Sequence, residues 1–408
     1  MKIETASILF PKVAEANREA LKQLGKKLRE SKKQNEWMLC LGAGVSISAK
    51  LPNWPKLLAR LSAQMLPPRG KRNHAERKLD GAFYDEVEQF YQTFSRDSDF
   101  AQKFENALKG KYTGLFEKMN LLEAAEYIRN FLEESMSDSL EDREALRSAI
   151  NLSINYMIER ACRTDVKVEP GKNDLSGSTL AAVARLMKSE KDHLIHNAIT
   201  YNYDNLLETY LRNICGCDAC KVHSIDKKAD LRGFGNNDDW NIYHVHGRIP
   251  VIPYPSEEMS DSVILTESDY YEEEQINYSW TNIIQSYAML RSNMIFIGFS
   301  GADYNFRRII KYVNRENGKS EENAMLKEHY IFFSINSIVE SVLSEKIKSE
   351  KEWEERLEAL YRGEKEYAFE RLMINYLAFA QTKYWERHGL KVIWSSHEEL
   401  YQDLESLH

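Results

Sequence analysis

The chain has 408 residues, enough for one large α/β domain with an insertion or for two to three domains of ordinary size. Hydrophobic residues make up 43% and charged residues 29%, which is typical of a globular protein and excludes a disordered chain. The net charge of −8 disfavours direct nucleic-acid binding by this chain alone. Because we find no transmembrane segment and no signal peptide, and because five cysteines are too few for a disulfide scaffold, we expect a cytoplasmic protein without a membrane partner.

The N-terminal 35 residues are expected to form a helical arm. Residues 14–34 carry Leu21, Leu24 and Leu28 at the spacing of one helix face. The next segment, residues 37–41 (WMLCL), is a short apolar run that ends in glycine. Such a run is typical of a strand buried on both faces of a parallel sheet.

Residues from about 56 to 190 have long stretches of helical spacing with many charges, which predicts a large helical insertion. Strand-like runs then return at 194–200, 242–246, 262–266, 293–298, 329–334 and 391–394. Helical patterns separate most of these runs, as in βαβ units. The sequence therefore predicts an α/β fold, with a Rossmann-like, doubly wound, mostly parallel sheet. Its main domain would span residues 36–408 and be interrupted by the insertion.

A glycine-rich loop, Gly42-Ala43-Gly44-Val45-Ser46, follows the first predicted strand. Such a loop lets the backbone approach a pyrophosphate, although it is also what a plain tight turn requires. Two common nucleotide folds are disfavoured: Ile47 stands at the third glycine position of a dinucleotide fingerprint, and no G-K-S/T follows for a phosphate-binding P-loop. If this loop holds a nucleotide, it does so in another way.

Three further polar segments stand at the ends of predicted strands. They are Thr200-Tyr201-Asn202-Tyr203-Asp204, His246-Gly247, and Gly298-Phe299-Ser300 followed by Asp303. In an open parallel sheet, ligands bind beyond the carboxyl ends of the strands. We therefore expect these segments and the first glycine loop to converge on one crevice.

In this order, the four segments resemble the sirtuin family, which carries a GAG-x-S loop, a T-x-N-x-D segment, a histidine followed by glycine, and a later G-x-S turn. Two more segments, Leu51-Pro52-Asn53-Trp54 and Thr266-Glu267-Ser268-Asp269-Tyr270, resemble the divergent prokaryotic branch of that family. The resemblance covers residues 36–310 in spaced blocks and leaves out the insertion. Members of this branch are known mainly for cleaving NAD in antiphage defence, and some pair with a HerA-type ATPase.

The resemblance implies an NAD glycohydrolase, with NAD as substrate and no metal, that acts as a homo-oligomer gated by assembly or by such an ATPase partner. Asn202 would orient the attacking water and His246 would be the base. The cofactor-binding residues would be Gly42, Ala43, Gly44 and Ser46 at the pyrophosphate, Thr200 and Asp204 beside Asn202, and Gly298, Phe299 and Ser300 at the adenosine half.

Several alternatives stay open at this point. His244, two residues before His246, would lie on the same strand face and is a rival for the base. Cys215, Cys217, Cys220 and His223 resemble a zinc site only weakly, because the second CxxC pair of sirtuin deacylases is missing. The chain could also be a non-catalytic module that binds NAD or ADP-ribose and regulates an ATPase, or a sirtuin-type deacylase or ADP-ribosyltransferase. The trigger and the role of the insertion are left open as well.

Overall fold

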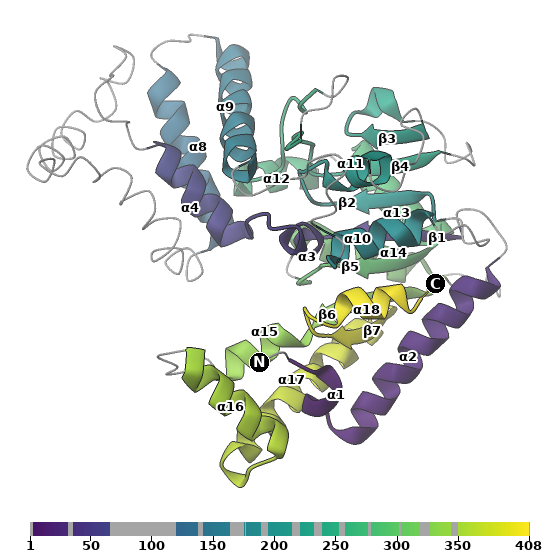
Figure 1. Cartoon of the computed structure of the whole chain (residues 1–408). Coiled ribbons are helices and arrows are strands. Elements are labelled where there is room, and N and C mark those ends of the chain that lie inside the picture. The colour runs from purple at the N-terminus through teal and green to yellow at the C-terminus, as the bar shows by residue number, and fades with distance from the viewer. Residues whose placement is uncertain are drawn as a thin grey trace, which may run out of the picture.

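The structure is a computed structural model whose described part consists of fourteen segments of the chain (Figure 1). These segments are residues 3–31, 36–65, 120–137, 142–163, 175, 177–188, 195–213, 221–231, 239–252, 258–275, 279–301, 303–317, 327–343 and 350–407.

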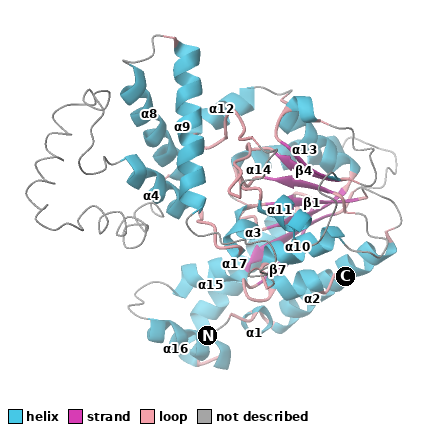
Figure 2. Ribbon diagram, turned by 45° about the horizontal axis from the view of Figure 1, so that its top comes forward, coloured by secondary structure: helices cyan, strands magenta, loops and turns pink. Residues whose placement is uncertain are grey.

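Seven parallel strands form a single sheet in the order β3-β4-β2-β1-β5-β6-β7. They are β1 (Trp37–Leu41), β2 (Asn197–Thr200), β3 (Val222–Ile225), β4 (Trp240–His244), β5 (Asn293–Ile297), β6 (His329–Ser334) and β7 (Leu390–Ser395). Figure 2 shows helices on both sides of this sheet. The predicted α/β, Rossmann-like fold with a doubly wound parallel sheet is confirmed.

The helices that cover the sheet and extend from it make up most of the remaining described chain. They are α1 (Thr5–Ile8), α2 (Pro11–Glu30), α3 (Ala43–Ser48), α4 (Trp54–Met65), α8 (Leu121–Ser137), α9 (Arg143–Arg163), α10 (Thr179–Lys188), α11 (Leu206–Asn213), α12 (Glu267–Gln275), α13 (Trp280–Arg291), α14 (Tyr304–Asn317), α15 (Ile335–Leu343), α16 (Glu350–Arg362), α17 (Ala368–Glu386) and α18 (Leu400–Glu405). No helix in these segments is long and apolar enough to cross a membrane.

Alternate side chains of each strand enter two different hydrophobic clusters, one on each face of the sheet. In β1, Leu39 belongs to the cluster shared with α10, α11 and α18, whereas Cys40 belongs to the cluster shared with α13, α14, α15 and α17. All five residues of β1 are buried. A continuous apolar run in the sequence is what a central strand covered on both faces requires.

Helices α4, α8 and α9 pack against one another beside the sheet (Figure 1). They fall in the predicted insertion, as does α10, which packs on α3, α11 and α18. The group of helices α4, α8 and α9 contacts α12 through a largely buried ion pair, in which Arg129 Nη1 of α8 lies 2.8 Å from Asp269 Oδ1. The proposed domain boundaries themselves stay a prediction.

The structure differs from the sequence prediction at three places, one wrongly predicted strand and two elements that were not predicted. Residues 262–266 form no strand, because the backbone amides of Leu265 and Thr266 donate to the Asp269 carboxylate and lead the chain into α12. A short helix, α3, begins at Ala43 directly within the glycine loop, where the sequence had predicted only a turn. Strand β3 was not predicted, because it has only four residues, of which only the first and the last are buried, and so short a segment shows no clear hydrophobic alternation.

Candidate active site at the carboxyl end of the sheet

The strand order places a topological switch point at β1. This strand lies between β2 and β5, so the chain crosses to one half of the sheet after β1 and to the other half after β4. Ligands of open α/β sheets bind at such points, outside the carboxyl ends of the strands. The glycine loop follows β1, the Asn202 segment follows β2, His246 follows β4, and Gly298 follows β5. The fold thus brings the four predicted segments to one edge of the sheet.

The loops after β1 and β5 touch through their backbones. The Gly42 amide donates to the Ile297 carbonyl at 2.9 Å, and the Gly44 amide donates to the Gly298 carbonyl at 3.0 Å. A Cβ on Gly42 would lie 2.6 Å from the Gly298 oxygen, and a Cβ on Gly298, whose φ is +77°, would lie 2.7 Å from Val45 N. These glycines are therefore required for close approach of two backbones.

This packing changes which donors the glycine loop offers. The amides of Gly42 and Gly44 are used within the protein and do not support the predicted contact of both with a pyrophosphate. The amide of Ala43, at the start of α3, makes no hydrogen bond to any described residue, and Ala43 is half-buried. Gly298 is also half-buried, Phe299 is 8% exposed, and Ser300 is exposed at the rim.

Ser46, Asp204 and Asn202 form a hydrogen-bonded chain with a defined direction. The Ser46 hydroxyl donates to Asp204 Oδ2 at 2.6 Å, so its oxygen is left to accept from Asn202 Nδ2 at 2.8 Å. Burial raises the pKa of Asp204, whereas the Ser46 hydroxyl and the Leu206 amide lower it. The predicted contact of the Ser46 hydroxyl with a pyrophosphate is not supported, because that hydroxyl is engaged inside the fold.

The side chain of Asn202 is held in one orientation. Its Nδ2 also donates to the Gly42 carbonyl at 3.0 Å, and its backbone amide donates to Thr200 Oγ1 at 3.1 Å. With Nδ2 committed to two acceptors, the opposite side-chain atom, Oδ1, makes no hydrogen bond to any described residue. Asn202 is only partly buried. The arrangement therefore presents a fixed, unused acceptor at the carboxyl end of β2.

His246 is buried among aromatic rings. Its ring centroid lies 4.7 Å from that of Tyr201 and 5.6 Å from that of Tyr270, both in edge-to-face geometry. Burial lowers the pKa of His246, although the charges of Asp303 and Glu273 act in the opposite direction. Its Nε2 is buried without a hydrogen-bond partner among the described residues. An imidazole in this state is neutral at physiological pH and can accept a proton.

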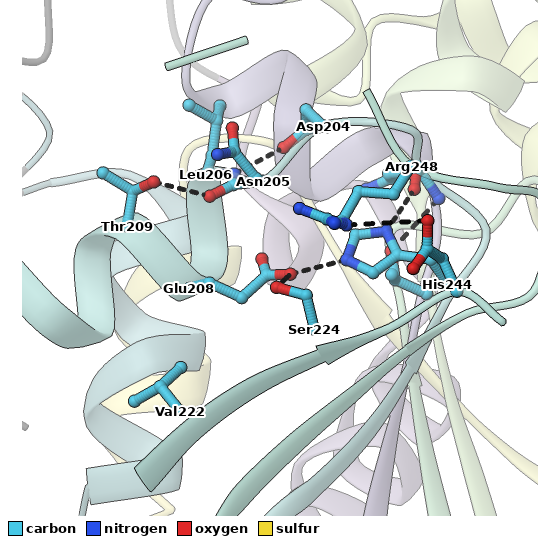
Figure 3. Close-up of polar contacts among 12 residues, drawn as sticks. Asp204, Asn205, Leu206, Glu208, Thr209, Val222, Ser224, His244 and Arg248 are labelled. Carbon is cyan, nitrogen blue, oxygen red and sulfur yellow. Dashed lines mark hydrogen bonds and ion pairs between the residues drawn. The ribbon is translucent and has the colours of Figure 1, made fainter. Parts of the chain in front are cut away.

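His244 lies deeper and is fully engaged, as Figure 3 shows. Its Nδ1 is 3.2 Å from the Asn202 carbonyl oxygen, and its Nε2 is 2.5 Å from Glu208 Oε1 on α11. Neither the His244 nor the Glu208 side chain is exposed. Of the two rival histidines, His246 is therefore the one with a ring nitrogen that is not already bonded.

Sequence reasoning missed the residues that enclose His246. Tyr270 donates its hydroxyl to Asp303 Oδ2 at 2.7 Å, and Asp303 Oδ1 accepts from the Phe306 amide at the start of α14. The sequence signal was present, because Tyr270 and Asp303 both stand in or beside the quoted motifs. The spacing of these motifs did not show that Tyr270 and Asp303 would meet beside His246.

Nothing in the described segments forms a metal site of three or more His, Cys, Asp or Glu side chains. His223 Nε2 lies 2.9 Å from Asp239 Oδ2, which gives this histidine an acidic partner. Cys215, Cys217 and Cys220 lie outside the described residues. The alternative that these cysteines and His223 bind zinc therefore stays untested.

Comparison with known families adds an independent finding. Residues 196–358 match the family model described as the SIR2-like domain. This match supports a sirtuin-like family. It includes the Asn202, His246 and Gly298 segments, and it begins after the glycine loop of β1. The match is consistent with an activity that uses NAD. No curated protein matches the sequence.

Proposed function

We propose that this protein is an NAD glycohydrolase, which converts NAD and water into ADP-ribose, nicotinamide and a proton. The observation that carries the proposal is the fixed orientation of Asn202, whose Nδ2 is tied to Gly42 and Ser46 while Oδ1 is left over. An unused acceptor of this kind can bind a water molecule and direct its oxygen toward the anomeric carbon of the nicotinamide ribose.

Cleavage of NAD requires few catalytic groups beyond one that positions the water. The bond between ribose and nicotinamide breaks with its electron pair going to nicotinamide, which leaves as a neutral molecule and needs no general acid. The ribose then resembles an oxocarbenium ion, as in glycoside hydrolysis. Water adds to the anomeric carbon, and His246 takes up the proton that is released or holds a ribose hydroxyl. Its lowered pKa keeps the imidazole neutral for this role.

The rest of the substrate would extend along the switch point. Ala43, at the start of α3, offers its amide to the pyrophosphate, and Gly42 and Gly44 make room for it by having no side chains. Gly298, Phe299 and Ser300 would border the adenosine half. Thr200 and Asp204 would act through Asn202 and Ser46, to which they are bonded.

The direct test is nicotinamide release from NAD by the purified full chain and by Asn202→Ala and His246→Ala. We expect the wild type to release nicotinamide and Asn202→Ala to lose about 10³-fold in kcat, the size of effect seen when one positioned polar group is removed. Turnover that Asn202→Ala leaves intact would overturn the site assignment. Tight NAD binding without turnover in every assembled state would favour the non-catalytic module, and activity only on acyl-lysine or protein acceptors would favour the transferases.

The proposal includes gating by self-association. Helix α17 exposes a stripe of large apolar side chains at alternating three- and four-residue spacing: Phe369 (68% exposed), Leu372 (52%), Tyr376 (60%) and Phe379 (54%). A second copy is the occupant we propose. Tyr376→Glu should then shift a wild-type oligomer toward monomer in sedimentation experiments, whereas a monomeric wild type would contradict this part.

The role in antiphage defence and the pairing with a HerA-type ATPase rest on the resemblance and form the outermost part of the proposal. Cells that carry the wild-type gene, with and without a neighbouring ATPase gene, would be challenged with phage. We expect protection, accompanied by a fall in cellular NAD, that Asn202→Ala abolishes. Protection that persists with Asn202→Ala would separate the defence role from NAD cleavage.

A further inference from the structure

A buried pair of charged side chains lies directly beneath Asn202. His244, at the end of β4, and Glu208, on α11, have fully buried side chains, and the Ser224 hydroxyl of β3 donates to the same Glu208 oxygen at 2.9 Å (Figure 3). None of these three residues stands in the segments predicted to touch substrate. A buried charged group is costly unless it is paired, so a structural or functional reason for the pair is required.

Both nitrogens of the His244 ring are within hydrogen-bonding distance of a partner. Both partners of the His244 ring are acceptors, namely the Asn202 carbonyl at Nδ1 and the Glu208 carboxylate at Nε2. Each ring nitrogen therefore faces an acceptor to which it can donate. Burial would raise the pKa of Glu208, but the charge of His244 and its hydrogen bond outweigh burial and lower this pKa to about 2. The pair is therefore an ion pair with one arm extended to Asn202.

That arm completes the restraint of Asn202. The side-chain Nδ2 is bonded to Gly42 and Ser46, and the backbone amide is bonded to Thr200. The carbonyl of Asn202, in the peptide that joins it to Tyr203, is bonded to His244 Nδ1. His244 thus restrains the backbone of the same residue whose side-chain amide is held by Gly42 and Ser46.

We propose that His244 is a positioning residue for Asn202, and that Glu208 serves to orient the His244 ring. This inference rests on the proposed NAD hydrolysis. It extends that hypothesis, because it assigns a role to the histidine that does not touch substrate. A misplacement of about 1 Å at a reacting group can cost about 10²-fold in rate, so a residue that only orients another can have a large effect on kcat.

Substitution of His244 by asparagine or by glutamine distinguishes this positioning role from a purely structural role, because each amide replaces only one of the two ring nitrogens. The asparagine side chain places its nitrogen near Nδ1 and can still donate to the Asn202 carbonyl, whereas glutamine places its nitrogen near Nε2 and reaches residue 208 instead. Both are made in the Glu208→Gln background, so that neither leaves a buried carboxylate unpaired. His329→Asn is the matched control, since it alters a buried histidine at the opposite end of the sheet.

We expect Glu208→Gln/His244→Asn to retain at least about tenfold more kcat than Glu208→Gln/His244→Gln, with KM values within about threefold of each other. His329→Asn should leave both constants unchanged. Equal kcat values for the two double variants would overturn the proposal, even if both were less stable than the wild type. A loss confined to KM would also overturn it.

A second readout does not depend on turnover. The side-chain amide of Asn202 gives an NMR signal in protein labelled with ¹⁵N-asparagine, and the Asn202→Ala variant identifies that signal. We expect it to shift in Glu208→Gln/His244→Gln and to stay near its Glu208→Gln position in Glu208→Gln/His244→Asn. If the wild type binds NAD without hydrolysing it and the signal still responds in this way, the proposed function fails and the positioning role stands. An unchanged signal in both double variants would refute the positioning role.

Discussion

Two buried histidines at opposite ends of the sheet look alike by several measures. His246 follows β4 at the carboxyl end, and His329 opens β6 at the amino end; each is 3% exposed. Burial lowers both pKa values, that of His329 to about 4. Each also has a buried Nε2 without a partner among the described residues. Burial, a lowered pKa and an unbonded nitrogen therefore do not identify a site by themselves.

The surroundings of the two rings differ. The Nδ1 of His329 accepts from the Met294 amide at 3.3 Å, which gives this ring a role in the strand pairing around it. His246 packs against Tyr201 and Tyr270, and Tyr201 is the residue directly before Asn202 in the chain. The carboxyl end also contains the interlocked glycines and the Asp204–Ser46–Asn202 chain. A histidine's position at the carboxyl end of the sheet is therefore better evidence for a functional site than its lowered pKa.

The largest expected effect uses two glycines with the same φ of +77°, one at each end of the sheet. A Cβ at Gly298 would meet the backbone of Val45 at 2.7 Å, whereas a Cβ at Gly389, before β7, would meet only the side chain of Asn314. We expect Gly389→Ala to cost about 1–2 kcal/mol of unfolding free energy, and Gly298→Ala to cost about 4 kcal/mol because two loops must also move apart. Denaturant unfolding measures both, and equal losses would show that the glycine contact is loose.

The next effect separates the two histidines by rate. His246→Asn should lower kcat for nicotinamide release about 100-fold, the usual scale for a lost acid–base group. His329→Asn keeps an acceptor near the Met294 amide and should leave kcat within about twofold of the wild type. Steady-state kinetics decides the matter. If both variants lost activity equally, the distinction between the two ends of the sheet would be broken.

The same His329 variant has a smaller expected effect on stability. The pKa of His329 is about 4 in the folded protein and 6.5 in the unfolded chain, so the unfolded state binds the proton more strongly. The stability this neutral ring provides is fully present above pH 6.5 and is lost as pH falls from 6.5 toward 4. We expect wild type to lose about 2 kcal/mol more than His329→Asn between neutral pH and pH 5. Parallel stability profiles for the two proteins would refute this.

The smallest effect concerns the pH dependence of the reaction. Because the pKa of His246 is lowered from 6.5, the base is already neutral at physiological pH, and the acidic limb of kcat/KM should lie below pH 6.5. Between about pH 7 and pH 8 the rate should change by less than about twofold. A limb centred above pH 6.5 would indicate that another group, or a charged His246, controls the reaction.

Much of the fold could be predicted from local patterns. The apolar run Trp37–Leu41 marked the central strand, because both of its faces are covered and no polar alternation is needed. Segment 262–266 was wrongly predicted to be a strand, since an apolar stretch whose amides are bonded to Asp269 has the same composition as a strand. The helix at Ala43 was missed because glycines lower helical propensity, while here they serve the contact with Gly298.

The site could be predicted as a set of residue types but not as a set of bonds. Motif spacing was enough to single out Asn202 and His246, and it left His244 as a rival. The direction of the Asp204–Ser46–Asn202 chain and the hydrogen bond of His244 to Glu208 depend on side chains from α3, the loop after β2, β4 and α11. Residues that are 36 to 158 positions apart carry no local signal of such contacts.

The sequence by itself determined the class of fold and the four loops at strand ends, because periodicity and glycine placement are local properties of the chain. Only the tertiary structure decided which hydrogen-bonding groups remain available. It used the amides of Gly42 and Gly44 and the hydroxyl of Ser46 within the fold, and it left Oδ1 of Asn202 and Nε2 of His246 without protein partners among the described residues. The physical reason is that a donor or acceptor is consumed by whichever group the packing brings within about 3 Å of it.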